Sequence, residues 1–481
     1  MTLLCRMAKK QLILFILLIG LCLPLMAGIH SYTNNSVLSD GHWIKIRVSE
    51  SGVCRMSFSE LSNAGINPQQ LRVFGYGGAQ LLQDFTKPKC DDLPQVPVYV
   101  GDGYVLFWVQ GPISWTYNGT RFVHTRNTYS DYGYYFLTDN VGELLAPTTG
   151  VAVSGTPTEI TVYPHYQVHD KDSLNLIDRS GVSGGGRTFY GEQFKVNQTR
   201  GFLFQTPNAI EGENSTAHIE VAAFSSNVSN FYATLNSGYS KSVTIRAAAD
   251  NYTFGCTGSL DLNTISAAGS QRVDLTLQSS NSAALGWLNY IELTTPSALQ
   301  MTGSWLPVRT TVNYKQSTPV RFHLQGADAA TQVWDITSPD AIRRMETQFS
   351  DGELTWIGTQ EDGVHEYVAV NPQGNSFVHA DVIGEVAHQN LHALNNIDYV
   401  IICPEGYEAI SRELAQAHEE KEAITWSVVT DQQVYNEFSS GTPDATAYRW
   451  LMKMLYDRAN DGIGQKPRWL LLMGHGTFDN R

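Results

Sequence analysis

Apolar and polar residues alternate along much of the first 390 positions, which is the spacing of half-buried β-strands. The stretch HWIKIRVSESGVCRMSFSEL alternates, turns at Ser51-Gly52 and then alternates again, so it predicts a β-hairpin. The following SELSNAG predicts a short helix with a glycine stop, and LRVFG predicts a strand over residues 71–74. We therefore expect a first β-rich domain over residues 28–155.

Many short strands are also expected between residues 156 and 390. Segments such as AHIEVAAFSS, KSVTIRAAA, QRVDLTLQSS and LNYIELTTP are rich in β-branched and aromatic residues, and turn residues separate them. This spacing is typical of two antiparallel sheets packed face to face. The region is predicted to form a β-sandwich-like domain.

The pattern changes near residue 391. NIDYVIICPEG, ITWSVVT and RWLLLMG each hold an uninterrupted apolar run, which is typical of parallel strands buried on both faces. The intervening YEAISRELAQAHEEKEA has Tyr407, Ile410 and Leu414 on one helical face, and TPDATAYRWLMKMLYDRANDG predicts a second helix with Thr442 as its N-cap. The order strand-helix-strand-helix-strand predicts the start of a doubly wound parallel α/β domain over residues 391–481. Because a parallel sheet needs cover on both faces, we expect this domain to continue beyond the last residue.

Composition narrows the classes of function. Apolar residues make up 42% and charged residues 16% of the chain, so we expect a folded protein and not a disordered one. The net charge of -14 argues against nucleic-acid binding, which needs a basic surface.

The first 27 residues predict a signal peptide. Arg6, Lys9 and Lys10 precede an apolar run over residues 11–25, and Met26-Ala27-Gly28 offers a small-residue cleavage site. An uncleaved membrane anchor is the alternative, although the run is short for a membrane span. We therefore expect the protein to be exported.

Four cysteines follow the predicted signal peptide, namely Cys54, Cys90, Cys256 and Cys403. They are widely scattered and include no C-x-x-C pair, which argues against a zinc site. Export permits disulfides, and four cysteines allow three pairings among which the sequence does not choose.

Two residues of the α/β region are candidate catalytic groups. LLLMGHGTFDNR places His475 between two glycines at the expected carboxyl end of a parallel strand, where open α/β sheets collect ligands and catalytic groups. VIICPEG places Cys403 near the tip of the first strand. In a 2-1-3 strand order these two strands are neighbours, so Cys403 and His475 could form a thiol–imidazole dyad. The alternative is a loop histidine and a buried thiol that packs as a small apolar group.

Beyond these patterns, the chain resembles the gingipain-like cysteine peptidases of family C25, and among them the sortases of the type IX secretion system. The matching stretches lie in order from residue 36 to the end and include SVLSDGHWIKIRVSESGVCRMSFSEL, LRVFGYGG, DDLPQVPVYVGDGYVLFWVQGP, NTYSDYGYYFLTD, GRTFYGEQF, GWLNYIEL, QVYNEFSSGTPDATAYRWLMKMLYD and WLLLMGHGTFDNR. The resemblance implies a β-rich region followed by two α/β subdomains, with the catalytic histidine and cysteine in the second subdomain, beyond residue 481. Such proteins usually have Gly-Asp-Gly where this chain has Gly474-His475-Gly476, so His475 departs from the family pattern.

The resemblance also implies a function. It implies a cell-surface, outer-membrane-associated cysteine endopeptidase and transpeptidase that removes the C-terminal signal domain of secreted cargo proteins and attaches the cargo to anionic lipopolysaccharide. Outer-membrane secretion components are the implied partners, and no cofactor is required. Gingipain-like domains can carry calcium, but Asp479 and Asn480 fall far short of the six to eight ligands that calcium needs. Since the implied catalytic residues lie outside it, the chain as given is expected to be inactive.

Two other functions stay open at this point. The first is a non-catalytic outer-membrane adaptor or structural protein with a degenerate gingipain-like domain, which the departure at His475 keeps in consideration. The second is a general gingipain-like protease that digests external protein.

Overall fold

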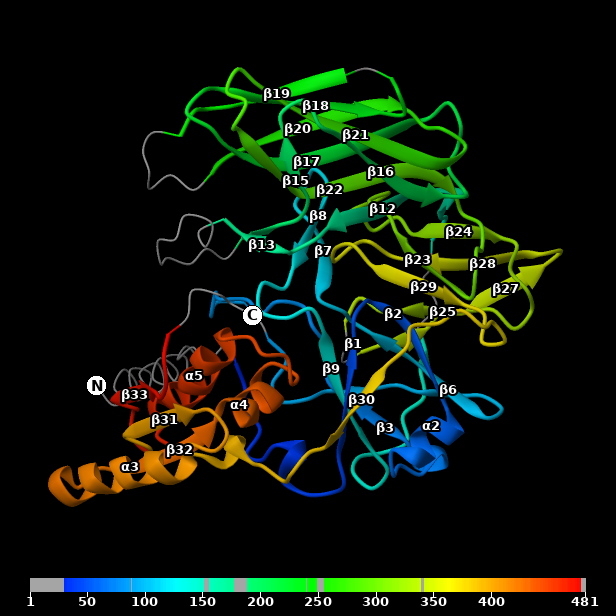
Figure 1. Cartoon of the computed structure of the whole chain (residues 1–481). Helices are drawn as coiled ribbons and strands as arrows, with labels where there is room; N and C mark the ends of the chain where they lie inside the picture. The colour runs from blue at the N-terminus through cyan, green and yellow to red at the C-terminus, as the bar shows by residue number, and fades with distance from the viewer. Residues whose placement is uncertain are drawn as a thin grey trace, which may run out of the picture.

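The computed structural model describes residues 30–87, 89–150, 155–176, 188–238, 240–248, 255–338 and 341–476. Figure 1 shows three β-rich parts stacked along the molecule and a smaller α/β part, in orange and red, beside the N-terminal β-rich part. The predicted fold class, β-rich domains followed by a doubly wound parallel α/β segment, is confirmed. The predicted signal peptide, residues 1–27, lies outside the described residues.

The N-terminal unit consists of two sheets that enclose one core. They have the strand orders β30-β1-β9-β3-β4 and β2-β6-β5. Their strands are β1 (Ile44–Val48), β2 (Gly52–Ser57), β3 (Arg72–Phe74), β4 (Gln95–Val96), β5 (Tyr99–Val100), β6 (Tyr104–Val109), β9 (Gly133–Thr138) and β30 (Asp381–Glu385). The expected short helix is α2 (Phe58–Asn63), and it begins at a capping box in which Ser57 and Glu60 satisfy each other's backbone N–H groups.

β1 and β2 do not form a hairpin, so that prediction is wrong. β1 pairs with β9 and β30, whereas β2 pairs with β6. Both strands are buried at nearly every residue, so each needs cover on both faces, and the turn at Ser51 carries the chain from one sheet to the other. A local turn signal does not determine which strands pair, because packing against distant segments decides it.

The core of the N-terminal unit draws on residues from far along the sequence. Val53 and Phe107 share one hydrophobic cluster with Trp334, Val368 and Val370. The predicted boundary between residues 155 and 156 therefore separates two stretches of sequence that pack into the same core.

Residues 162–298 form a β-sandwich, drawn in green in Figure 1. One sheet has the order β12-β22-β17-β20 with β15 also paired to β22, and the facing sheet has the order β16-β21-β18-β19. The strands are β12 (Val162–Asp170), β15 (Gln193–Lys195), β16 (Thr199–Thr206), β17 (Asn214–Phe224), β18 (Ser229–Leu235), β19 (Ser240–Ile245), β20 (Cys256–Ile265), β21 (Gly269–Ser279) and β22 (Leu285–Ala298). A small ribbon of β13 (Leu174–Asn175) and β14 (Phe189–Tyr190) lies beside them.

A second pair of sheets combines strands from the described residues of 299–370 with two short strands that precede the sandwich in the sequence. The strand orders are β10-β26-β25-β29-β23 and β11-β24-β28-β27. The strands are β10 (Thr148–Thr149), β11 (Thr158–Ile160), β23 (Trp305–Arg309), β24 (Val320–Gln325), β25 (Gln332–Asp335), β26 (Arg343–Arg344), β27 (Thr347–Ser350), β28 (Glu353–Gly358) and β29 (Glu366–Val370). Phe322 stacks on Trp356 with ring centroids 4.5 Å apart in its core. The region that was predicted as one sandwich over residues 156–390 thus contains two separate hydrophobic cores.

A hairpin links the N-terminal unit to the green sandwich. It consists of β7 (Ile113–Tyr117) and β8 (Phe122–Arg126), which pair only with each other. His124 of this hairpin is buried between two carboxylates of the sandwich, with Nδ1 2.6 Å from Glu292 Oε1 and Nε2 2.8 Å from Asp170 Oδ2. Arg121 also pairs with Glu292, so the hairpin is tied to the sandwich by charge.

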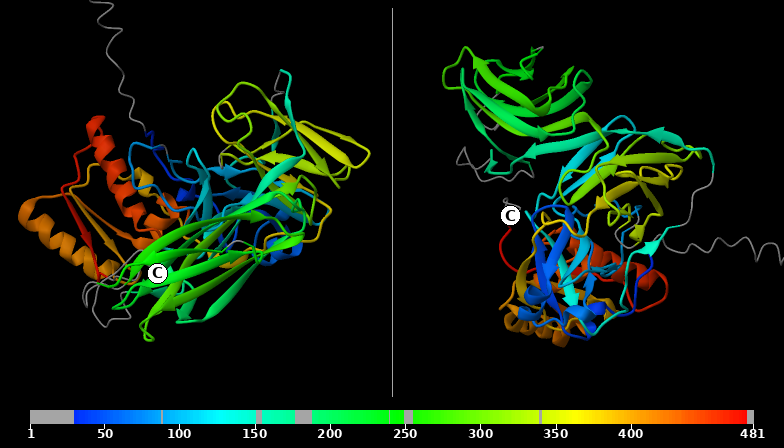
Figure 2. Two further views of the ribbon diagram at one scale, coloured as in Figure 1. Left: turned by 90° about the horizontal axis from the view of Figure 1, so that it is seen from above. Right: turned by 90° about the vertical axis from the view of Figure 1, so that its right-hand side faces the viewer.

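The α/β segment has three parallel strands in the order β32-β31-β33, which is the predicted 2-1-3 order. The strands are β31 (Tyr399–Cys403), β32 (Trp426–Thr430) and β33 (Trp469–Leu472), and the helices are α3 (Glu408–Glu422), α4 (Asp431–Phe438) and α5 (Thr446–Asn460). Successive residues of β31 point to opposite faces: Ile401 packs with Ala415 of α3, and Ile402 packs with Leu451 of α5. Figure 2 shows the strands lying between α3 and α5.

Two predicted helix details are wrong. The second predicted helix begins at Thr446, so Thr442 is not its N-cap. Thr442 and Asp444 instead form a buried loop that bonds to the backbone of Gly77 and Leu81 in the N-terminal unit. In α3, the face with Ile410 is exposed, and the helix packs on the sheet through small residues, Ser411 and Ala415.

Two further features of the fold concern the cysteines and the lengths of the helices. Cys54, Cys256 and Cys403 are free thiols, so none of the three open pairings of the four cysteines is present. Within the described ranges, no helix combines the length and the apolar character that crossing a membrane would require.

Candidate functional site

The three parallel strands end at one edge of their sheet, beside the N-terminal unit. Cys403 is the last residue of β31 and stands opposite Thr430, the last residue of β32, while Ile402 stands opposite Leu472 of β33. His475 follows the end of β33 by three residues. Ligands and catalytic groups of open α/β sheets gather at such carboxyl ends. Both residues that the sequence singled out therefore belong to this edge.

Cys403 is a buried thiol that faces α3. Its side chain is only 1% exposed, and Sγ lies 3.6 Å from the carbonyl oxygen of Val429, to which it donates. Burial raises the pKa of the thiol, although a hydrogen bond with Ser411 acts in the opposite direction. A thiolate and not a thiol is the attacking species of a cysteine peptidase. Cys403 thus has the properties of a structural cysteine.

His475 lies in the open turn after β33. The strand continues as far as the bond from Met473 N to Ile402 O at 2.8 Å, and Gly474 then adopts a φ of 123° that turns the chain away. The imidazole is exposed, and it has no hydrogen bond or ion pair with any residue in the described part of the chain. The structure thus brings His475 and Cys403 to one edge without joining them, and a catalytic role for either stays a prediction. Asp479 and Asn480 lie outside the described residues.

A lysine of the N-terminal unit reaches into the same edge. Lys45 is 7% exposed, and its ammonium donates to Asn436 Oδ1 at 3.0 Å and to Gly441 O at 2.9 Å. It also lies over the ring of Tyr134, 4.6 Å from its centroid. Burial lowers the pKa of Lys45 to about 8, opposed by the charge of Glu405. The ammonium sits where α4 ends, and a cation is favourable there because it faces the negative end of the helix dipole.

A cavity of about 380 Å³ lies beside this lysine. Its wall includes Glu405 after β31, Thr430 at the end of β32, and the first turn of α4. Residues of β30 also line this cavity, and β30 belongs to the N-terminal unit. The candidate edge is therefore closed on one side by another part of the protein. Sequence reasoning missed Lys45, because the alternation in WIKIRV places it among the expected solvent-facing positions.

A second group of residues that sequence reasoning missed is a buried histidine cluster. His392 is fully buried, and its Nδ1 lies 2.5 Å from Glu437 Oε2 while its Nε2 lies 3.2 Å from Asp91 Oδ1. Asp92 is 4.0 Å away. Burial works against the charged imidazole, but the carboxylates of Asp91 and Glu437 outweigh it and raise the pKa of His392 to about 9. The histidine is therefore an imidazolium at neutral pH.

Asp92, His392 and Glu437 are also of the residue types that bind metal ions, and their ligand atoms lie within 4.8 Å of one another. Each is already engaged within the protein. Glu437 accepts hydrogen bonds from the backbone N–H groups of Leu391 and His392, and Asp92 accepts from Ser36 Oγ and Val37 N. A protonated histidine accounts for these contacts without a metal. The cluster joins the N-terminal segment, the linker before β31, and α4.

The comparisons with known proteins fit this geometry. Residues 392–481 match the model of peptidase family C25. This segment is therefore similar to peptidase family C25. The match begins at His392 and covers all three parallel strands and the helices between them, so the edge described above is part of the C25 segment.

One solved structure covers nearly the whole chain. It is dimeric latent PorU from Porphyromonas gingivalis, with a TM-score of 0.81 and 28% sequence identity over 94% of this chain and 43% of that chain. The resemblance to the gingipain-like peptidases, and to PorU in particular, is confirmed. The chain spans less than half the length of that PorU.

Several other similar structures cover part of the chain. A CBM35 from Cellvibrio japonicus Abf62 matches 28% of this chain and 96% of its own at 13% identity and a TM-score of 0.20. The CBM36-1 domain of a xylanase from the hindgut metagenome of Trinervitermes trinervoides matches 27% of this chain and 96% of its own at 9% identity and a TM-score of 0.19. These scores are too low to support an argument about fold or function. No curated protein matches the sequence.

Proposed function

We propose that this chain is part of a secreted, cell-surface cysteine endopeptidase and transpeptidase, a sortase of the type IX secretion system. It removes the C-terminal signal domain of cargo proteins and attaches the cargo to anionic lipopolysaccharide. A cysteine thiolate attacks a peptide carbonyl of the cargo, the C–N bond breaks, and the C-terminal signal domain leaves as a protonated amine while a thioester forms. An amine or water then attacks the thioester and releases the thiolate. Outer-membrane secretion components are its proposed partners.

The match to PorU along 94% of the chain is the observation that carries this proposal. It extends through the β-rich units and not only through the C25 segment, so it favours the sortase over a general digestive protease of the same family. The catalytic histidine and cysteine are proposed to lie outside these 481 residues. Within the described residues, the buried Cys403 and the exposed His475 do not form an assembled dyad.

That last observation also favours a second candidate function. A non-catalytic adaptor on the outer membrane would use the β-rich units for docking and would need no nucleophile in the α/β segment. The two functions predict different fates for the cargo, because an adaptor acts on transport whereas a sortase acts on the transported protein.

Disruption of the gene in its own organism separates them. We expect secreted cargo to reach the cell surface with its C-terminal signal domain still attached, as measured by intact-mass spectrometry of surface fractions. Cargo that stays inside the outer membrane would instead support the adaptor. Cargo that is exported, trimmed and anchored as in the parent strain would contradict both functions.

A second experiment concerns the chain itself. The purified 481-residue protein is expected to leave a fluorogenic peptide uncleaved. Cleavage that disappears in Cys403→Ala and persists in the control Cys256→Ala would contradict this expectation and would make Cys403 the nucleophile.

A further inference from the structure

A large crevice lies outside the α/β segment, where the three β-rich parts meet. Its volume is about 590 Å³, within the range of pockets that hold small ligands. The walls come from the N-terminal unit, from β7 of the linking hairpin, from β12 of the sandwich, and from β23 and β29 of the second pair of sheets. None of the residues at the carboxyl ends of the parallel strands lines it, so a function for this crevice does not depend on the proposed peptidase activity.

Six aromatic residues contribute to the walls. Trp115 and Tyr166 meet on one side with ring centroids 5.9 Å apart, and Trp108 and Trp305 meet at right angles on another with centroids 6.4 Å apart. Trp115, Tyr166 and Trp305 are only partly buried, so their rings are accessible from the crevice. Broad, accessible aromatic faces in a pocket are platforms on which the apolar faces of flat or ring-shaped ligands stack.

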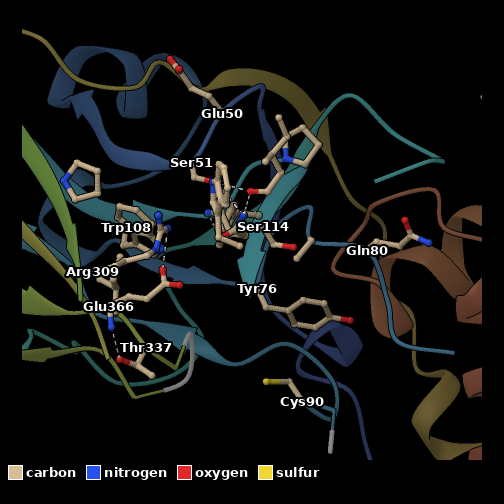
Figure 3. Close-up of a pocket in the computed structure, with 18 of the residues that line it drawn as sticks. Glu50, Ser51, Tyr76, Gln80, Cys90, Trp108, Ser114, Arg309, Thr337 and Glu366 are labelled. Atoms are coloured by element: carbon tan, nitrogen blue, oxygen red, sulfur yellow. Dashed lines mark hydrogen bonds and ion pairs between the residues drawn. The ribbon is translucent and has the colours of Figure 1, made fainter. Parts of the chain in front are cut away.

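A pair of charged side chains stands beside these rings. Arg309 of β23 and Glu366 of β29 form an ion pair at 3.0 Å, and their side chains are 15% and 25% exposed. The Nε atom of Arg309 is buried and has no hydrogen-bond partner among the described residues. Figure 3 shows the pair beside Trp108, with Tyr76 and Cys90 across the crevice. The pair presents donors and acceptors side by side, which is the arrangement that engages neighbouring hydroxyl groups.

The charges of the walls are balanced. Glu50, Lys89, Arg309 and Glu366 are the only charged residues that line the crevice within the described part of the chain, giving two positive and two negative groups. A strongly anionic or cationic ligand would meet no excess of opposite charge here. The lining therefore favours a neutral ligand that carries both apolar faces and hydroxyl groups.

The floor of the crevice is rigid. Gln110 Nε2 donates to Ser51 Oγ at 2.9 Å and to Ile113 O at 2.7 Å, and the hydroxyl of Tyr135 accepts from Gln110 N at 2.7 Å. These bonds fix the start of β7, which carries Trp115, against the N-terminal unit. Walls that are held in place before binding reduce the entropic cost of binding a ligand.

The walls also distinguish a sugar from a peptide. β23 is the edge strand of its sheet, but the residues that line the crevice, Trp305, Pro307 and Arg309, are alternate residues on one face of that sheet. A peptide that binds by strand addition pairs with the backbone of an edge strand and not with the side chains on a sheet face. We propose that this crevice is a binding site for a short neutral oligosaccharide, whose rings stack on Trp115 and Trp305 and whose hydroxyls bond to Arg309 and Glu366.

Calorimetric titration of the purified chain tests this proposal. The probes are maltotriose, cellotriose, xylotriose and mannotriose as neutral sugars, trigalacturonate as an acidic sugar, and a proline-rich decapeptide. We expect saturable binding of at least one neutral trisaccharide. Trp115→Ala and Arg309→Gln are each expected to weaken that binding about tenfold or more, which is the scale of one lost stacking or hydrogen-bonding group.

Trp469→Phe is the matched control, since Trp469 is an exposed tryptophan of β33 outside the crevice, and it is expected to change affinity by less than about twofold. Circular dichroism and thermal melting establish that each variant is folded, and Glu366→Gln provides a second, milder change in the same ion pair. Binding of trigalacturonate alone or of the peptide alone would overturn the proposal, as would a lack of binding by all four neutral sugars. Equal binding by the parent chain and both crevice variants would overturn it as well.

Discussion

His392 and His124 have similar electrostatic surroundings in different parts of the molecule. Each imidazole is buried between two carboxylates, and each joins segments that are far apart in the sequence. His392 and Asp91 are 301 residues apart, and His124 and Glu292 are 168 residues apart. Removing one partner of a buried ion pair is costly because the other charge is left without compensation. Single residues at these points therefore control how the units are joined.

The first prediction concerns Glu437, which is fully buried and accepts hydrogen bonds from His392 and from two backbone N–H groups. We expect Glu437→Ala to lower the free energy of unfolding by about 3–5 kcal/mol, because a buried imidazolium and two N–H groups lose their partner. Urea denaturation provides the measurement. Glu420→Ala, on the exposed side of α3, is the control and is expected to change stability by less than about 0.5 kcal/mol. Similar midpoints for the two variants would show that the cluster does not stabilise the fold.

A second prediction concerns pH. Hydrogen bonds and charges of their carboxylate partners raise the pKa of both His392 and His124 to about 9 against the opposing effect of burial, whereas the unfolded value is near 6.5. Their stabilising contribution is therefore fully present below pH 6.5 and is lost as the pH rises through 9. Between pH 6.5 and 8 we expect the free energy of unfolding to fall by roughly 1 kcal/mol per pH unit for each imidazole.

The window ends at pH 8 because two lysines act in the opposite direction above it. Burial lowers the pKa of Lys45 and Lys89 to about 8, so their folding penalty is relieved between pH 8 and 10.5. His392→Gln is expected to reduce the slope between pH 6.5 and 8 by about half. A slope that is unchanged in this variant would mean that His392 does not carry the raised pKa.

The third prediction uses thiol reactivity to test the candidate nucleophile. Cys403 is 1% exposed and burial raises its pKa, whereas Cys90 is partly exposed in the wall of the crevice. At pH 8 we expect iodoacetamide to modify Cys90 at least tenfold faster than Cys403 in the native protein, because alkylation needs an accessible thiolate. Peptide mapping by mass spectrometry measures both rates in one sample. Faster labelling of Cys403 would revive its role as a nucleophile.

At the scale of elements, the α/β segment shows which helices the spacing of apolar residues predicts and which it misses. The long helix α5 was expected, and Leu451, Met454 and Leu455 are buried on its inner face. The eight-residue α4 was not expected, because it spans barely two turns and gives too few repeats for a pattern. Its start is nevertheless written in the sequence: Thr430 and Gln433 form a capping box at its N-terminus. Short helices are thus better found by their caps than by their apolar spacing.

The fourth prediction follows from this cap. Thr430 Oγ1 accepts from Gln433 N, and Gln433 Oε1 accepts from Thr430 N. Thr430→Ala is expected to destabilise the protein by about 1 kcal/mol, while Thr430→Ser, which keeps the hydroxyl, is expected to cost less than half of that. Thermal melting of the two variants side by side measures the difference. Equal losses would assign the effect to packing of the methyl group and not to the cap.

At the scale of the whole molecule, the β7–β8 hairpin determines how the sandwich is placed on the rest of the protein. The hairpin pairs with no other strand of the described residues, so its position depends on side chains and not on a shared sheet. The carboxylate of Glu292 accepts hydrogen bonds from the guanidinium of Arg121, from the backbone N–H of His124 and from the His124 ring. The crevice described above lies at the root of this hairpin, and its shape depends on the same anchor.

The fifth prediction tests that anchor. We expect Glu292→Ala to increase the radius of gyration in small-angle X-ray scattering and to expose residues 113–126 to limited proteolysis, because the hairpin loses its buried counter-charge. Asp261→Ala is the control, since Asp261 is an exposed carboxylate within the sandwich that pairs with His218. If both variants scatter and digest like the parent chain, the hairpin is held by apolar contacts alone.

The sequence by itself determined which segments of this protein form strands and helices. Alternation predicted the β-rich region, and the order of the apolar runs and helices predicted three parallel strands in a 2-1-3 sheet, because each of these signals depends on neighbours a few residues apart. The predicted burial of the third strand is wrong, since Trp469, Leu470 and Leu472 of β33 are exposed. Because the carboxyl ends of parallel strands meet at one edge of a sheet, the sequence also placed Cys403 and His475 at the same edge. The resemblance to gingipain-like peptidases came from ordered stretches of sequence along the chain.

Only the tertiary structure decided which distant segments meet. The pairing of β1 with β30, the reach of Lys45 to the end of α4, the contacts of His392 with Asp91 and of His124 with Glu292, and the crevice between the β-rich parts all join residues more than a hundred positions apart. A polar residue in a strand or a linker looks solvent-exposed until its partner is known, so neither Lys45 of β1 nor His392 of the linker before β31 gave a local signal. Burial and charge pairing are properties of the assembled fold, because they depend on what packs against a side chain and not on what precedes it in the chain.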